Sequence, residues 1–139
     1  MSTEGNKAVF RRWCEVISQN RLDCVEEIVA LDEVDHALPP GVPPGFEGLK
    51  QLFVLLHTAF PDLQVEIEDL IAEGDKVVGR VTVRGIHRGE FMGIAATGKP
   101  VSFTAIDIVR IANGRIAERW SQGDNLDLSQ QLGAIPALG

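Results

Sequence analysis

Apolar residues recur every three or four positions through much of the first 60 residues, the spacing of amphipathic helices. This spacing predicts one helix over 7–20 and another over 47–60, which Pro61 ends. Asp23 is placed to cap a shorter helix between them. A brief strand over 31–38 then runs into a proline- and glycine-rich loop, which can continue neither a helix nor a strand.

From residue 63 the pattern changes to strands joined by tight turns. Gly74-Asp75 and Asn113-Gly114 are hairpin signals, and each lies between two runs rich in β-branched residues. The predicted strands are 63–73, 76–87, 101–112 and 115–124. Residues 88–99 are predicted to form a long apolar loop, and 126–132 a last helix with Gly133 after its end. The expected fold class is therefore α+β, with three N-terminal helices packed on one face of an antiparallel sheet.

Composition narrows the class of protein. At 139 residues, 45% of them hydrophobic, the chain is long enough for one good core, so we expect a single domain over 1–139. A net charge of -7 argues against a nucleic-acid or anionic-membrane partner, and no apolar run approaches the ~20 residues of a membrane span. The N-terminus lacks a signal-peptide pattern, which favours a cytoplasmic protein. Cys14 and Cys24 are expected to be buried free thiols.

The last predicted strand concentrates the candidate chemistry. Strand alternation places one set of its side chains on a common face: Ile116, Glu118, Trp120, Gln122 and Asp124. A two-residue turn at Asn113-Gly114 would pair Phe103 with Asp124, and Asp107 with Trp120. Such a face is typical of an apolar pocket that contains one reactive polar side chain. It fits equally well a half-buried strand with a solvated tip.

Carboxylate acid–base chemistry is the function class that the residues leave open. The chain has no glycine-rich phosphate loop, no Gly-x-Ser-x-Gly nucleophile pattern and no tyrosine to hold an oxyanion. Trp120 and Phe103 as neighbours would desolvate Asp124 and raise its pKa, which suits removing a proton from carbon next to a carbonyl. Asp124 could instead be an anion at the N-terminus of the last helix. Asp107 is the weaker candidate, with a solvated or interface carboxylate as its alternative.

The remaining polar candidates carry two interpretations each. His36 and His87 could hydrogen bond to a ligand or be structural histidines, and His57 is assigned no role. The three histidines lack metal-ligand spacing, so no metal site is expected. Five arginines are expected mostly at solvent or at a subunit interface, although one of them could stabilise an enolate: Arg80, Arg84, Arg88, Arg110 and Arg119.

The order and spacing of several short motifs resemble the SnoaL-like polyketide cyclase family, within the nuclear transport factor 2-like superfamily. The resemblance covers about Phe46 to Gly133. Its pieces are Phe46-Glu47-Gly48, Ala59 to Leu63, Glu73 to Val78, Gly85 to Ile94, Thr97-Gly98-Lys99, Asn113 to Ile116, Glu118 with Trp120 and Asp124, and Gln131-Leu132-Gly133. It implies a cone-shaped α+β barrel, a strongly bent sheet around helices that encloses an apolar pocket, and a homodimer through the sheet.

The resemblance also implies site residues. The family's cyclases use an Asp at the position of Asp124 as acid/base in an intramolecular aldol ring closure without a cofactor, and His36 and His87 match positions near the pocket. Ala95-Ala96 replaces the family's usual prolines, and Ile86 replaces a Thr, which removes a hydroxyl. The expected substrate-binding residues are Trp13, Phe53, Phe60, Met92, Phe103, Trp120 and Gln122.

The leading hypothesis is a small enzyme for a hydrophobic carbonyl compound, in which Asp124 moves a proton and His36, His87 or Gln122 orients the carbonyl oxygen. A non-catalytic module that binds an apolar metabolite is one alternative. Another is an isomerase or epoxide hydrolase. The tyrosine of ketosteroid isomerase is missing, and epoxide hydrolysis needs an arginine between two carboxylates such as Asp107 and Asp124. No arginine lies on their predicted face.

Overall fold

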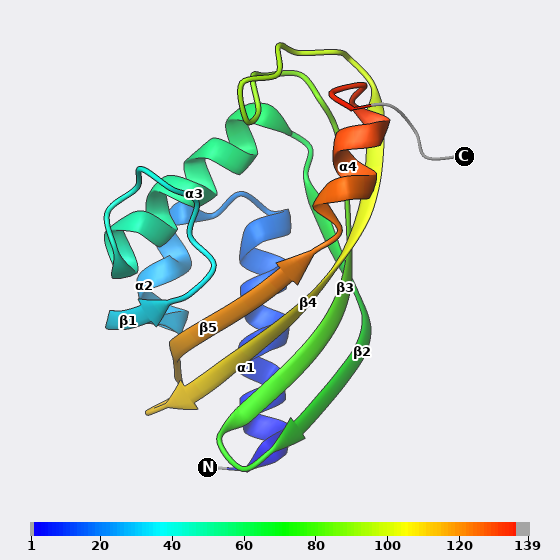
Figure 1. The fold of residues 1–139 in the computed structure, drawn as a ribbon. Helices are drawn as coiled ribbons and strands as arrows, with labels where there is room; N and C mark the ends of the chain where they lie inside the picture. Colours follow the sequence, from blue (N-terminus) through cyan, green and yellow to red (C-terminus); the bar gives the residue numbers. More distant parts are fainter. Residues whose placement is uncertain (1, 136–139) are drawn as a thin grey trace.

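In a computed structural model of the chain, which describes residues 2–135, a short strand lies among the first helices, longer strands follow, and a short helix comes last (Figure 1). The elements in order are α1 (Thr3–Ser18), the 3-10 turn η1 (Leu22–Cys24), α2 (Val25–Ile28), β1 (Val29–Asp35), α3 (Gly45–Ala59), β2 (Gln64–Glu73), β3 (Lys76–Ile86), β4 (Pro100–Ala112), β5 (Arg115–Gly123) and α4 (Asn125–Gln131). None of the helices within these residues is long and apolar enough to cross a membrane.

The helix ends follow their capping residues. Helix α1 begins before residue 7 because the Ser2 hydroxyl accepts a hydrogen bond from the Gly5 backbone N–H at 2.9 Å. The second helix is shorter than predicted: Asp23 lies inside η1 and pairs with Arg21 at 3.2 Å instead of capping. The helix ends at Ile28, and Val29 is the first residue of β1. α2 is therefore a single turn that leads directly into the sheet.

The strands form one curved sheet in the order β1-β5-β4-β3-β2. All neighbours are antiparallel except β1 and β5, which run parallel. The predicted α+β architecture is confirmed. The sheet bends around α1 but does not close into a barrel, because β1 and β2 remain at its two edges (Figure 1).

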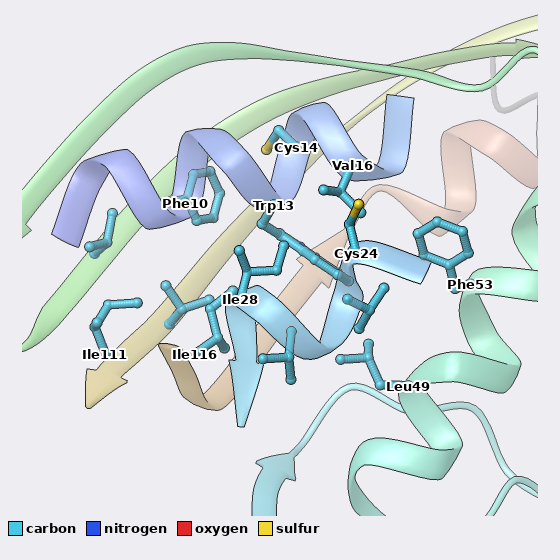
Figure 2. Packing of buried hydrophobic residues seen from close by; sticks show 14 of the residues in the cluster. Phe10, Trp13, Cys14, Val16, Cys24, Ile28, Leu49, Phe53, Ile111 and Ile116 are labelled. Atoms are coloured by element: carbon cyan, nitrogen blue, oxygen red, sulfur yellow. The ribbon is translucent and has the colours of Figure 1, made fainter. Parts of the chain in front are cut away.

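The concave face of the sheet holds the larger of two apolar clusters. Helix α1 packs against β2 and β3 and buries Phe10, Trp13 and Val16 in this cluster (Figure 2). Cys14 and Cys24 are buried there as free thiols, as predicted. The smaller cluster gathers Ala59, Phe60, Leu63, Val101, Leu128 and Leu132 beneath α4. The two clusters leave a space between α1, α3 and the sheet.

A bulge in β5 changes the predicted register. Ile111 pairs with Ile116, but Arg110 pairs with Glu118, so Ala117 is an extra residue in β5. Beyond it Asp107 lies opposite Ser121, not Trp120. The predicted pairing of Phe103 with Asp124 is also wrong, since β5 ends where Gly123 pairs with Ala105.

The bulge reverses the two faces of β5. A one-residue shift in a strand moves every later side chain to the opposite face. Ile116 points into the core, and Glu118, Trp120 and Gln122, which were predicted to share its face, do not. Arg119 and Ser121 take the inner positions.

Candidate active site

A cavity of about 250 Å³ lies between α1, α3 and the concave face of the sheet. Most of its wall is apolar, with Trp13 from α1, Phe53 from α3 and Phe103 from β4. The polar part of the sheet wall consists of Asp107 and Ser121 with Arg119 beside them. The sheet wall of this mostly apolar cavity thus carries a carboxylate, a hydroxyl and a guanidinium.

Asp107 is a buried carboxylate in this wall. Burial raises its pKa above the usual value, while the Arg119 guanidinium and a hydrogen bond from the Ser121 hydroxyl oppose the shift. Within residues 2–135, its Oδ1 has no hydrogen-bond partner. An acid with a raised pKa and an unused oxygen is able both to accept and to return a proton.

Arg119 is held in place by a second carboxylate. Its Nε donates to Asp35 Oδ2 at 2.8 Å, and both side chains are almost fully buried. Arg119 Nη2 lacks a partner among the described residues. Asp35 of β1 therefore fixes the Nε side of the guanidinium, and Nη2 remains as a buried donor without a partner in the described residues, beside the cavity.

Glu33 lies behind this ion pair on β1. It is 3% exposed, and neither carboxylate oxygen is hydrogen bonded within the described part of the chain. Burial and the neighbouring Asp35 raise its pKa to about 8, although Arg119 lowers it. Glu33 thus holds a proton at neutral pH, and Arg119 is left to pair with Asp35.

Asp124 does not have the desolvated environment expected for it. Its side chain is exposed and accepts a hydrogen bond from the Asp127 backbone N–H at 3.0 Å, which caps α4. This is the alternative arrangement considered for it, an anion at a helix N-terminus. Its neighbours Gly123 and Asn125 line the cavity, so Asp124 lies at the rim.

His36, Trp120 and Gln122 do not line the cavity. The His36 ring stacks on Trp120 with centroids 5.1 Å apart, and its Nε2 lies 2.7 Å from a Glu118 oxygen. Hydrogen bonds from His36 and Arg110 lower the pKa of Glu118. Gln122 is exposed. His36, Trp120 and Glu118 therefore form a cluster outside the cavity.

His87, Phe60 and Met92 also lie apart from the cavity lining. His87 is buried against Phe60, with ring centroids 5.6 Å apart. Its Nδ1 lies 3.3 Å from the Thr97 backbone N–H and 3.0 Å from the Thr97 hydroxyl. Met92 is mostly exposed in the loop after β3. His87 therefore ties the two ends of that loop together.

The family is decided by a match over nearly the whole chain. The profile described as SnoaL-like polyketide cyclase covers residues 7–132. The chain belongs to this family. The SnoaL-like chain is 28% identical over 129 residues to the aklanonic acid methyl ester cyclase DnrD of Streptomyces peucetius, a match that spans 90% of this chain and 88% of DnrD.

Solved structures agree with this SnoaL-like assignment. TsrD from Streptomyces laurentii superposes with a TM-score of 0.89 at 27% identity, over 97% of this chain and 99% of TsrD. IdmH from Streptomyces antibioticus, a proposed polyketide cyclase, has a TM-score of 0.80 at 32% identity, over 92% of this chain and 98% of IdmH. The fold of the described residues is therefore that of SnoaL-like proteins.

The sequence did not predict several residues that line the cavity of this SnoaL-like protein. His57 lies one helical turn after Phe53, so its position on the inner face of α3 follows from helical spacing. Arg119 and Ser121 reach the cavity only because of the bulge at Ala117, which no local sequence signal announces. Within residues 2–135, no group of three or more His, Cys, Asp or Glu side chains is placed to hold a metal ion.

Proposed function

We propose that this protein is an enzyme of the polyketide cyclase type that needs no cofactor and moves a proton on a hydrophobic carbonyl compound. The reaction is an intramolecular aldol ring closure or a related proton transfer. The observation that carries the proposal is the buried Asp107 carboxyl, beside the spare donor of Arg119 in an apolar cavity. We further propose that residues 1–139 form one SnoaL-like domain that acts in the cytoplasm.

The proposed chemistry uses three side chains. Asp107 as carboxylate removes a proton from carbon next to a carbonyl, and its raised pKa makes it the stronger base for this step. Negative charge develops on the carbonyl oxygen, where Arg119 Nη2 can donate, while the Ser121 hydroxyl donates to Asp107 and orients it. The enolate carbon then bonds to a second carbonyl carbon of the same molecule. The resulting alkoxide takes the proton back from Asp107.

Asp124 is the second candidate for the proton-transfer group, because the family resemblance points to it and the cavity rim holds it. Its exposure argues for a lesser role than that of Asp107, since water surrounds its carboxylate and one of its oxygens already caps α4. Substitution of Asp124 is therefore the comparison for substitution of Asp107.

Deuterium exchange at the carbon next to the carbonyl of 2-tetralone tests the proposal without knowledge of the natural substrate. NMR should show exchange accelerated by the wild-type protein. Asp107→Asn should slow it at least ~100-fold, the usual contribution of a general base. Asp124→Asn should change it only a few-fold.

The other outcomes are equally informative. If only Asp124→Asn greatly slows the deuterium exchange, Asp124 at the rim is the general base instead of Asp107. Equal rates in wild type and Asp107→Asn would refute Asp107 as the base. Binding of 2-tetralone without any acceleration would favour the non-catalytic binding module. Ring closure of aklanonic acid methyl ester, the compound in the name of DnrD, is the second reaction to follow.

Epoxide hydrolysis is a second candidate function, favoured by the arrangement around Arg119. The guanidinium pairs with Asp35 at 2.8 Å and also influences the pKa of Asp107, so it lies between two carboxylates. The bulge brings this arginine to the inner face, where the sequence predicted none. Incorporation of ¹⁸O from labelled water into a diol from 1,2-epoxytetralin would identify this activity.

The outer face of the sheet supports a homodimer. Val34, Ile71 and Ile106 are large apolar side chains on the strands, and each is about half exposed or more. Side chains that alternate with them point into the core, such as Ala105 next to Ile106. We propose that two copies of this chain associate through this face, which would remove these side chains from water.

A further inference from the structure

His57 is a buried polar group that the proposed proton transfer does not use. It lies near the end of α3 and is 8% exposed. Within the described residues, neither of its ring nitrogens has a hydrogen-bond partner. The ring packs against Phe53, with centroids 4.6 Å apart, and it lines the cavity. A buried imidazole without partners is costly, so the site favours an occupant that can bond to it.

The charge state of His57 determines which hydrogen-bonding group the occupant needs. Burial lowers the pKa of the ring, while the nearby Ile17 carbonyl opposes the shift. A neutral imidazole has one donor nitrogen and one acceptor nitrogen. The Ile17 backbone carbonyl, which acts on the pKa of the ring, is an acceptor toward which the N–H can point. The other nitrogen then presents a lone pair, which a hydroxyl group satisfies.

The position of His57 in the cavity separates it from the reacting groups. Its neighbours on the α3 wall are Leu49, Leu52, Phe53 and Leu56, all apolar. Asp107, Arg119 and Ser121 belong to β4 and β5, which form the sheet wall of the cavity, whereas His57 belongs to the helix wall. A ligand that contacts both walls needs oxygen functions at two separated places on an apolar frame.

We infer that His57 binds a hydroxyl group of the ligand, which makes the substrate a cyclic hydrophobic compound with a hydroxyl remote from its reacting carbonyl. The inference rests on the proposed function in one respect, that the occupant is the substrate. An engineered apolar cavity of ~150 Å³ holds one benzene ring, so about 250 Å³ has room for a substituted ring. Larger substrates would extend past the rim at Asn125.

Two ring compounds of nearly the same shape provide the test. p-Cresol and p-xylene differ by a hydroxyl in place of a methyl group, and protein NMR titration measures both dissociation constants. The ratio of the p-xylene constant to the p-cresol constant should fall about tenfold in His57→Leu, the value of one hydrogen bond. His57→Gln, which keeps an acceptor, should retain most of the wild-type ratio.

Two controls accompany the titration. Thr58→Ala removes an exposed hydroxyl on the next residue of α3 and should leave both constants unchanged. The ¹⁵N signals of the His57 ring should shift with p-cresol and not with p-xylene. A purely structural role for His57 would leave these signals insensitive to the ligand's hydroxyl.

Two results would overturn the inference. One is an unchanged ratio in His57→Leu, and the other is wild-type protein that binds neither compound up to their solubility limits. Neither measurement involves turnover. If deuterium exchange of 2-tetralone is not accelerated but the ratio of dissociation constants depends on His57, only the proposed enzyme activity is refuted. If exchange depends on Asp107 but the ratio is unchanged in His57→Leu, only the hydroxyl site is refuted.

Discussion

At the scale of single residues, the cost of burying Glu33 should be measurable as a pH dependence. Its pKa in the folded chain is about 8, against an ordinary value of 4.5. The folded state therefore keeps a proton that the unfolded state releases between these pH values. The stabilising contribution of this group is complete below about pH 4.5 and is lost as the pH rises through 8.

Replacing Glu33 by Gln should remove this dependence, because an amide does not ionise. Compared with wild type, Glu33→Gln should gain unfolding free energy between pH 5 and pH 8, with a slope of up to about 1.4 kcal/mol per pH unit. Urea unfolding at several pH values measures the difference. A difference that stays constant over this range would show that Glu33 ionises normally in the folded chain.

At the scale of elements, the approach of α1 to the sheet depends on Gly79 of β3. A Cβ at this position would fall well inside van der Waals contact with the Phe10 ring, which is fully buried. The glycine thus provides the space into which the helix inserts its aromatic side chain. This contact links the first turns of the chain to the middle of the sheet.

Gly79→Ala should therefore destabilise the protein by about 1–3 kcal/mol, the usual cost of overpacking. Phe10→Leu introduced with it should recover part of the loss, which a double-mutant cycle from chemical denaturation would show. Gly123→Ala is the matched control, because its Cβ would lie 3.5 Å from its nearest neighbour, an ordinary contact. Equal losses in the two variants would contradict the packing argument.

The elements also show where sequence reasoning succeeds and where it stops. The hairpin at Asn113-Gly114 is predictable, because both residues adopt positive φ angles, 54° and 74°, that this dipeptide tolerates. The bulge at Ala117 is not predictable, because no residue of this stretch signals an extra position in the ladder. It explains why Arg119 was missed and why the predicted partners of Asp107 and Asp124 were wrong.

At the scale of the whole molecule, the homodimer proposal depends on the outer face of the sheet. Ile106 is 50% exposed in the middle of β4. Ile106→Lys would place a charge in the proposed interface and should convert the dimer to a monomer in light-scattering measurements. Leu126→Lys, at an equally exposed residue of α4, should leave the dimer intact. A wild-type protein that is monomeric at high concentration would contradict the proposal.

The architecture as a whole was easier to predict than the cavity. Helical and strand periodicities depend on many residues, so one unexpected position does not change the fold class. The cavity depends on the direction of a few side chains. His57 needed only the helical spacing of α3, whereas Arg119, Asp35 and Glu33 meet through the parallel pairing of β1 with β5, which spans more than 80 residues of sequence.

The extra residue in β5 has a consequence for comparing relatives. Two chains can share the spacing from Trp120 to Asp124 letter for letter and still direct opposite sets of side chains inward, if only one of them contains the bulge. The role of a residue on this strand therefore depends on which residue of β4 it pairs with, as well as on its identity. If Ala117 instead paired opposite Arg110 in a regular ladder, Trp120 and Gln122 would replace Arg119 and Ser121 as the chamber's lining, without a change in any residue.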